Sequence, residues 1–316
     1  MLGQVTLSDF TNWRGESIPS ITLTYQVTGP ALGSAPIVLV CHALTGNSAI
    51  AGPEGWWAKL IGPGQTIDTA RYSILSIDIP GNEYAGSAPL DDPSLLNVKD
   101  VARLWLLVLR ELRVDHLYAL IGPSLGGGLA WQIATLEPTL ADLLFPIATD
   151  YKTSDWILAQ TEVQRLILEH SDRPIHDARV HAMLTYRTPM SLIKRFEGKR
   201  VEDSGLPKVI DWLDYHGHKL EERFSLSAYR VMTFLTSTIH AAESEEELSR
   251  IASDIHLVAI DSDRLFPYFV ARETIEGLKH FGKGRAELHT IVSDHGHDAF
   301  LIEYDQLCRI MSPFFP

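Results

Sequence analysis

The stretch Leu117-Tyr-Ala-Leu-Ile-Gly-Pro-Ser-Leu-Gly-Gly-Gly-Leu-Ala-Trp-Gln132 decides the fold. Its apolar beginning predicts a buried strand, and a helical pattern follows at Leu129–Leu136. Between them lies Gly122-Pro-Ser-Leu-Gly126, a Gly-x-Ser-x-Gly motif in the strand–turn–helix context that a nucleophilic serine requires. A side chain at either outer glycine would collide with so tight a turn, which lifts the Ser124 hydroxyl above the sheet edge. We therefore predict Ser124 as a nucleophile.

Two other structures could carry the same stretch, namely an ordinary turn between strand and helix, or a phosphate-binding loop. A phosphate loop needs a Lys or a G-x-G-x-x-G pattern, and this stretch has neither. The strand before the turn and the helix after it favour the nucleophile turn over an ordinary one. At the start of that helix, the amide of Leu125 would point at a developing oxyanion, with the helix dipole behind it.

Short apolar runs rich in Val, Ile and Leu recur along the chain and alternate with helical patterns. Such runs are typical of strands buried on both faces, as in a parallel sheet. In Val98–Arg113 the apolar residues fall at three- and four-residue spacings, which predicts an amphipathic helix. The alternation predicts an α/β fold with a mostly parallel, doubly wound sheet. The predicted strands are Ile37–Cys41, Tyr72–Ile77, Leu117–Ile121, Leu143–Ile147, Ile255–Ile260 and Leu288–Val292.

The pattern changes after about Asp150. From there to about Leu248 the sequence is helix-like and poor in strands, and strand-like runs return at Ile255. The simplest organisation is one α/β core domain, residues 1–150 and 249–316, interrupted by a helical cap at residues 151–248. An insertion of about 100 residues is within the usual size of a sub-domain.

The composition indicates a soluble enzyme that binds neither nucleic acid nor membranes. Lys plus Arg number 27 and Asp plus Glu number 40, which leaves a net charge of −13, whereas nucleic-acid backbones and anionic membranes attract a basic face. No apolar run is long enough to span a membrane, and the first ten residues lack the features of a signal peptide. The only cysteines, Cys41 and Cys308, exclude a disulfide framework. We expect a cytoplasmic location.

A serine nucleophile needs a histidine base, which in turn needs a carboxylate to orient it. In folds with this kind of turn the three follow in the order Ser, Asp, His, each in a loop after a strand. The strand Ile255–Ile260 ends in Asp261-Ser262-Asp263, and the last predicted strand ends in Ser293-Asp294-His295-Gly296-His297-Asp298. The residues favour Asp263 and His297, with Asp261 and His295 as the alternatives.

The pairs His216/His218 and His295/His297 raise the alternative of a metal site. Zinc needs three or four ligands in fixed geometry, and neither pair has a nearby Cys or an H-E-x-x-H partner. We therefore expect no metal. The second oxyanion amide should come from the loop His42–Gly46, which follows the strand Ile37–Cys41, and a backbone amide near Leu44 is the candidate.

The chain also resembles the homoserine O-acetyltransferases of the α/β-hydrolase fold, particularly the shorter branch of Bacteroidetes-type bacteria. Blocks that match this family occur in order over most of the chain, and together they are highly specific. They are Val40–Gly46, Gly55–Gly64, Ile67–Thr69, the Ser124 turn, Ala178-Arg179, Leu184–Arg187, Tyr215–Gly217, Glu222–Phe224, Ala228-Tyr229, Asp261–Pro267 and Gly296–Leu301.

The resemblance implies a role for each of several residues. Ser124 is the expected nucleophile, Asp263 the residue that orients the histidine, and His297 the base. Three further residues are expected to bind the amino-acid acceptor: Arg179 its carboxylate, with Tyr186 and Asp298 completing the site. Arg179 and Tyr186 are seven residues apart, two helical turns, so one cap helix could present both to one pocket. A guanidinium suits a carboxylate, and an aspartate suits an α-ammonium group.

The resemblance further implies an enzyme that moves an acetyl group from acetyl-CoA to the γ-hydroxyl of L-homoserine by a ping-pong mechanism, in methionine biosynthesis. Acyl-CoA and L-homoserine are the expected small-molecule partners, with acetyl-CoA as co-substrate and no cofactor. A homodimer through the cap helices is also expected. The alternatives are a serine esterase or thioesterase of the same fold, a serine O-acyltransferase, a homoserine O-succinyltransferase, and a non-catalytic member that only binds a ligand.

Overall fold

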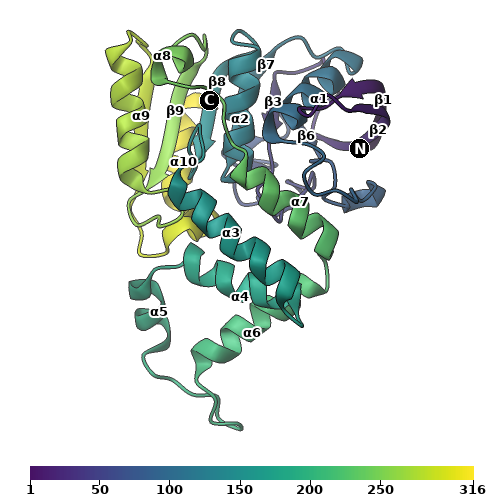
Figure 1. The fold of residues 1–316 in the computed structure, drawn as a ribbon. Coiled ribbons are helices and arrows are strands. Elements are labelled where there is room, and N and C mark those ends of the chain that lie inside the picture. The colour runs from purple at the N-terminus through teal and green to yellow at the C-terminus, as the bar shows by residue number, and fades with distance from the viewer.

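The protein is described by a computed structural model that covers residues 1–316. An eight-stranded sheet with the order β1-β2-β6-β3-β7-β8-β9-β10 forms its centre (Figure 1). The strands from β6 to β10 are parallel, whereas β1 and β2 are antiparallel to their neighbours. The bounds are β1 Leu2–Thr11, β2 Ser17–Thr28, β3 Ile37–Val40, β6 Ser73–Ile77, β7 Leu117–Pro123, β8 Ala141–Ile147, β9 Asp254–Ile260 and β10 Ala286–Ile291.

The parallel strands are buried because helices cover both faces of the sheet. Helices α1 (Val98–Glu111), α2 (Leu125–Leu136) and α9 (Tyr268–His280) cover one face (Figure 1). Helix α10 (Tyr304–Met311) and the segment 50–72, which contains the short strands β4 (Ile61–Gly62) and β5 (Ile67–Asp68), pack on the other. Successive residues of β3 point to opposite faces, so each strand contributes to both apolar cores.

All six predicted strands are present as β3, β6, β7, β8, β9 and β10, with ends displaced by no more than two residues. The antiparallel hairpin β1–β2 was not among the predicted strands. Its residues alternate between exposed and buried along much of its length, so it lacks the continuous apolar runs of the parallel strands. The predicted α/β fold with a mostly parallel sheet is confirmed.

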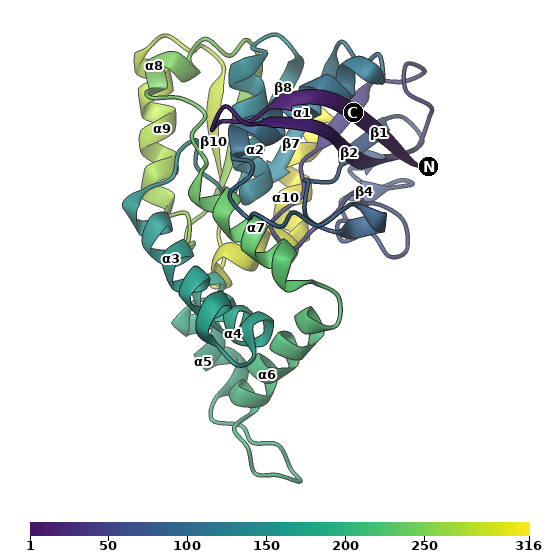
Figure 2. The same cartoon turned by 45° about the vertical axis from the view of Figure 1, so that its right-hand side comes forward.

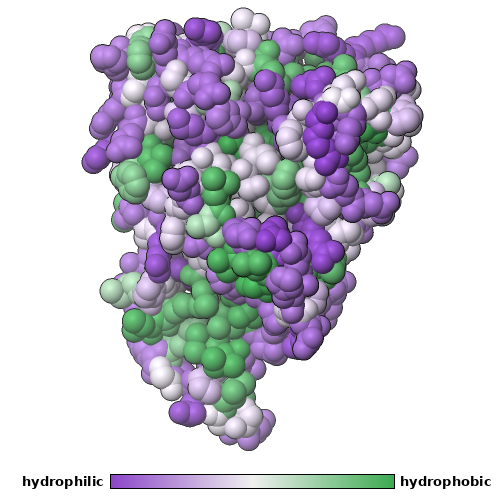
Figure 3. Space-filling view, viewed as in Figure 1, coloured by the Kyte–Doolittle hydropathy of each residue, from purple (hydrophilic) through white to green (hydrophobic).

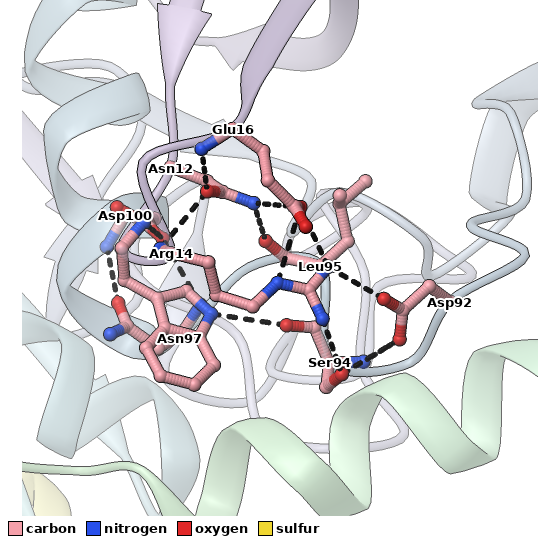
Figure 4. A network of polar contacts seen from close by, with 9 residues as sticks. Asn12, Arg14, Glu16, Asp92, Ser94, Leu95, Asn97 and Asp100 are labelled. Atoms are coloured by element: carbon pink, nitrogen blue, oxygen red, sulfur yellow. Dashed lines mark hydrogen bonds and ion pairs between the residues drawn. The ribbon is translucent and has the colours of Figure 1, made fainter.

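A polar network anchors this hairpin to the first helix (Figure 4). The buried carboxylate of Asp100 accepts a hydrogen bond from the backbone amide of Trp13 at 2.9 Å. Asn97 caps α1 by accepting from the amide of Asp100, and the Asp100 side chain reciprocates, which forms a capping box. Arg14 extends the network to Asp92 at 2.6 Å. These hydrogen bonds therefore hold the turn of the hairpin against the start of α1.

The chain between β8 and β9 contains helices and no further strand of the sheet. Helices α4, α5 and α6 project beyond the edge of the sheet in both views (Figures 1 and 2), whereas α7 and α8 return to pack beside α2 and α9. The bounds are α3 Asp155–His170, α4 Pro174–Tyr186, α5 Pro189–Phe196, α6 Lys208–Glu221, α7 Leu226–Ser237 and α8 Glu245–Leu248. We call α3 to α6 the cap helices. No helix in the structure has the length and apolar character that crossing a membrane requires.

Replacing Leu39 by Ala should strongly destabilise the core. Leu39 lies in β3, between β6 and β7, and has no exposed surface. The cavity left by the missing side chain should lower the free energy of unfolding by about 2–5 kcal/mol, measured by urea denaturation. Leu2→Ala, at a residue that is 53% exposed, is the control and should change it by less than about 0.5 kcal/mol. Equal losses in the two variants would contradict this description of the core.

Candidate active site

The backbone at Ser124 adopts a conformation that few side chains tolerate. Ser124 joins β7 to α2 with φ 54° and ψ −125°, and its amide donates to the carbonyl oxygen of Ile147 at 2.9 Å. A Cβ at Gly126 would lie 2.3 Å from the Cys41 carbonyl oxygen, and one at Gly122 would lie 2.1 Å from that of Gly126. Both contacts are too close for any side chain, so glycine is required at the two positions where the motif predicts it.

The structure brings Ser124, His297 and Asp263 into one hydrogen-bonded chain. The hydroxyl Oγ of Ser124 lies 2.9 Å from Nε2 of His297, and Nδ1 of the same ring lies 2.8 Å from Oδ2 of Asp263. All three residues are buried, with exposed fractions of 8% or less. The alternatives do not reach the serine: Asp261 accepts from the amide of Ser293, and the His295 ring faces Arg187.

The Asp263 carboxylate is held in place by the backbone that follows it. Its other oxygen, Oδ1, accepts from the amides of Leu265 at 2.8 Å and Phe266 at 3.0 Å. Oδ2 therefore faces the imidazole with its lone pairs, and Nδ1 of His297 must carry the proton that bridges them. This leaves Nε2 free to accept from the Ser124 hydroxyl, which is the tautomer that a general base requires.

Two opposing effects act on the pKa of His297. Burial lowers it, because an imidazolium loses hydration inside the protein. The charge of Asp263 and its hydrogen bond raise it, and the charge of Asp298 adds to this, so that the pKa ends above the ordinary value of 6.5. The site therefore stabilises the imidazolium that forms when His297 takes the proton of the Ser124 hydroxyl.

The two amides predicted for an oxyanion site lie on adjoining segments. Leu125 is the first residue of α2, where an amide has no helical partner. Leu44 lies in a turn closed by the hydrogen bond from the amide of Gly46 to the carbonyl oxygen of Ala43, and its own amide has no partner within the chain. The contact between Gly126 and the residues before this turn places the two segments together.

A buried network that the sequence analysis missed supports this turn. Nε2 of His42 accepts from the amide of Ile79 at 3.0 Å, while its Nδ1 donates to the carbonyl oxygen of Ala43 at 2.9 Å. The neighbouring carboxylate of Asp78, 1% exposed, accepts from Ser48 and Asn82, as well as from the hydroxyl of Thr24. The network thus joins two loops that begin after adjacent strands. Its only signal in the sequence is a histidine and an aspartate placed directly after those strands.

Two of the residues predicted for the acceptor lie on α4, and the third follows His297. The Tyr186 ring centroid lies 5.3 Å from that of His297, and the Arg179 guanidinium lies 5.8 Å from the Tyr186 ring centroid. Burial raises the pKa of the Tyr186 hydroxyl, with Arg179 opposing and Asp298 reinforcing the effect. Arg179 is half-buried and makes no hydrogen bond or ion pair within the chain. A guanidinium in that position is available to a ligand carboxylate.

Arg187, for which we predicted no separate role, joins the cap to the loop of His297. Its side chain is only 5% exposed, and its Nη2 donates to Oγ of Ser191 at 2.7 Å and to Nδ1 of His295 at 2.8 Å. Its Nη1 lies 3.9 Å from Oδ2 of Asp298. Burial lowers the pKa of this guanidinium, and Asp298 partly restores it. A buried cation with these partners holds the loop that carries His297. The only sequence signal for this role of Arg187 is its place in the matched block Leu184–Arg187.

A small cavity of about 40 Å³ borders the predicted site. Leu44 and Tyr186 line it together with polar residues of α3 and α7, among them Gln164 and Thr233. Oε1 of Gln164 and Oγ1 of Thr233 are buried and have no hydrogen-bond partner. Thr233 also lines a cavity of about 540 Å³ between α3 and α7. Gln164 thus lines the small cavity, and Thr233 lies between the two cavities.

Comparisons with known proteins agree with this description. A family model described as the alpha/beta hydrolase fold matches residues 36–164. A homoserine O-acetyltransferase of Moorella thermoacetica is 32% identical over 95% of this chain and 91% of its own. The solved homoserine O-acetyltransferase of Staphylococcus aureus is 25% identical, with a TM-score of 0.82 over 99% of this chain and 94% of its own. The solved esterase E22 is 17% identical, with a TM-score of 0.87 over 100% of both chains.

Labelling of Ser124 by a fluorophosphonate should depend on the protonation of His297. Only neutral His297 can accept the serine proton, so the labelling rate should fall as the pH drops through a midpoint above 6.5. In Asp263→Asn the rate should fall by about 10²–10⁴-fold, because an amide favours the wrong tautomer, and the midpoint should move to lower pH.

The matched control is Asp261→Asn, at an exposed carboxylate two residues away in the same loop. It should keep both the rate and the midpoint. A variant of Asp263 that labels like the native protein would show that this carboxylate does not orient His297.

Proposed function

Since the chain belongs to the homoserine O-acetyltransferase family and is an acyltransferase of the α/β-hydrolase fold, we propose that it transfers an acetyl group from acetyl-CoA to the γ-hydroxyl of L-homoserine. The observation that carries the proposal is the chain of contacts from Ser124 through His297 to Asp263, with the unpaired Arg179 beside it. A buried nucleophile and base, and a half-buried cation for the acceptor, are thereby joined through Tyr186.

In the first half of the proposed reaction, Ser124 becomes acetylated. Nε2 of His297 takes the hydroxyl proton as Oγ attacks the thioester carbonyl carbon, and the amides of Leu44 and Leu125 donate to the resulting oxyanion. The carbon–sulfur bond then breaks, and the proton on His297 passes to the departing thiolate of CoA. Asp263 stabilises the transient imidazolium, which agrees with the raised pKa of His297.

In the second half, the acceptor takes the acetyl group from Ser124. His297 removes the proton from the γ-hydroxyl of homoserine, whose oxygen attacks the acetyl carbon. The bond to Oγ of Ser124 breaks, and the proton returns to that oxygen. CoA leaves before homoserine attacks the acetylated Ser124, so the kinetics are of the ping-pong type. The product, O-acetylhomoserine, would enter methionine biosynthesis in the cytoplasm.

The charges around Tyr186 support an amino-acid acceptor. The free guanidinium of Arg179 suits the α-carboxylate, and the Asp298 carboxylate, adjacent to the base, suits the α-ammonium group. Tyr186 packs between Arg179 and His297 and would separate the charged end of the acceptor from its reacting hydroxyl. Water that reached the acetylated serine would hydrolyse it, so the burial of the site also protects the intermediate.

The buried polar atoms near the site support a thioester donor with an amide-containing arm. The pantetheine arm of CoA carries two amides, each of which needs partners when it leaves water. Gln164 and Thr233 offer a carbonyl oxygen and a hydroxyl that have none within the chain. Both line the small cavity that also includes Leu44, whose amide we propose for the oxyanion.

The surface of the cap supports a homodimer. Figure 3 shows a broad apolar area over the lower part of the molecule, where the cap helices lie. Exposed patches of this kind mark interaction surfaces in soluble proteins. The exposed apolar residues of these helices include Trp156, Leu158, Leu184, Met190, Ile193, Ile210 and Tyr215.

The fold by itself does not distinguish this transferase from an esterase or thioesterase, because esterase E22 shares it. The feature that distinguishes the two is the acceptor site. A hydrolase needs only water as acceptor and has no use for a guanidinium held free beside Tyr186. L-serine as acceptor and succinyl-CoA as donor remain the alternatives within the transferase class.

Release of thiol from acetyl-CoA should require both L-homoserine and Ser124. We expect sustained release only when homoserine is present, and a loss of about 10⁴-fold or more in Ser124→Ala, measured with a thiol reagent. Release that ignores homoserine would identify a thioesterase. Release that appears only with succinyl-CoA or L-serine would change the donor or the acceptor.

Replacing Arg179 by Leu should separate transfer from hydrolysis. Loss of a charge-assisted contact with the acceptor carboxylate should lower kcat/KM for homoserine by about 10²–10³-fold. Hydrolysis of a small acetyl ester, which needs no such contact, should stay within about twofold of the native rate. Arg272→Leu, at an exposed arginine of α9 that pairs with Glu276, is the control and should change neither. Equal loss of both activities in Arg179→Leu would contradict the acceptor role.

A further inference from the structure

A cluster of metal-ligating side chains lies between two cap helices, apart from the proposed catalytic residues. His176 extends from α4 and is buried, whereas Asp214 and His218 lie one turn apart on α6 and are half-exposed. Nε2 of His176 lies 3.1 Å from Oδ1 of Asp214, and Nε2 of His218 lies 3.4 Å from Oδ2. All three ligand atoms lie within 4.8 Å of one another.

The separations between the imidazole nitrogens and Asp214 are close to those between the ligands of a zinc ion. Zinc bound tetrahedrally at 2.0–2.1 Å keeps its ligand atoms roughly 3.4 Å apart. Nε2 of His176 is 3.1 Å from Oδ1 of Asp214, and Nε2 of His218 is 3.4 Å from Oδ2, both near this value. Neutral imidazoles and a carboxylate are also ligands that zinc commonly takes.

A second carboxylate lies on the far side of each imidazole. Nδ1 of His176 lies 2.8 Å from Oδ1 of Asp177, and Nδ1 of His218 lies 3.4 Å from Oε2 of Glu221. Nη2 of Arg173 lies 3.2 Å from Nδ1 and 3.4 Å from Nε2 of His218, so this guanidinium must turn fully to Glu221 before His218 binds an ion. With a proton on each Nδ1, both Nε2 atoms then have lone pairs for the ion. In zinc sites, the histidine nitrogen that does not bind the metal usually donates a hydrogen bond to a carboxylate or a carbonyl oxygen.

The backbone and the local charge also fit a cation. A Cβ at Gly217 would lie 2.2 Å from Cδ2 of His176, so the missing side chain at 217 lets that ring reach α6. Three carboxylates, from Asp177, Asp214 and Glu221, surround the two imidazoles, and the one cation among them is Arg173, which pairs with Glu221 and also contacts the His218 ring. With neutral imidazoles, the cluster carries an excess negative charge that a divalent ion would neutralise.

We propose that His176, Asp214 and His218 bind one Zn²⁺ ion through Nε2, a carboxylate oxygen and Nε2, respectively. Water from the exposed side fills the fourth position. The ion cross-links α4 to α6 and so holds the helix that carries Arg179 and Tyr186. The inference rests on the ligand geometry alone and does not depend on the proposed acyl transfer.

The test is zinc binding to the chain without an affinity tag, after chelator treatment and removal of the chelator. Equilibrium dialysis against ZnCl₂ followed by metal analysis should give one Zn²⁺ per chain. In His218→Ala and in Asp214→Asn, both at half-exposed positions, the affinity should fall by about 100-fold. His240→Ala is the matched control, because His240 is equally exposed and pairs with a single carboxylate, Glu243; its affinity should stay within about twofold of the native value.

Two further readouts do not depend on activity. Zn²⁺ should raise the Tm of the native chain and of His240→Ala, and it should leave that of His218→Ala unchanged. Co²⁺ in place of Zn²⁺ should give the visible absorption of a tetrahedral site in the native chain, and this should be lost in Asp214→Asn. The absence of stoichiometric binding, or equal affinities in all four proteins, would overturn the proposal.

Discussion

The close approach of α2 to the end of β3 is the constraint on which the proposed site depends. With no side chain at Gly126, the backbone of the helix start touches the carbonyl oxygen of Cys41. Ser124, two residues before Gly126, has a positive φ, and the contact brings the turn that contains Leu44 next to Leu125. Both amides proposed for the oxyanion and the hydroxyl proposed as nucleophile therefore depend on one close backbone contact.

The sheet brings residues that are distant in sequence to the same place. Parallel strands end at one edge, so the loops after β7, β9 and β10 meet there, and Asp263 and His297 reach Ser124 from two of them. The cap restrains the same edge from outside. Arg187 joins α4 to the loop of His297, and a Cβ at Gly296 would lie 2.6 Å from the carbonyl oxygen of Tyr186. The proposed base and the proposed acceptor residues are thus held by a single interface.

How much of this could be predicted depended on how local each signal is. The parallel strands and the turn at Ser124 could be predicted because continuous apolar runs and a five-residue motif are local. The choice of Asp263 over Asp261 had only a two-residue offset to support it, together with the family resemblance, and its role remains a proposal. The hairpin β1–β2 was not predicted, because its half-buried strands lack a continuous apolar run. The role of Arg187 and the network of Asp78 were not predicted, because both depend on contacts between distant segments, which leave no pattern in a single sequence.

The separation of the site residues along the chain has a consequence for synthesis. Ser124 and His297 are 173 residues apart, and the whole segment from α3 to α8 lies between them. A ribosome therefore completes the serine turn long before it makes the histidine, at about 5–20 residues per second. During that interval the nascent chain carries a serine with no base beside it. The histidine proposed as the base meets Ser124 only when the last two strands, β9 and β10, have joined the sheet, so a chain that ends before β10 lacks the proposed base.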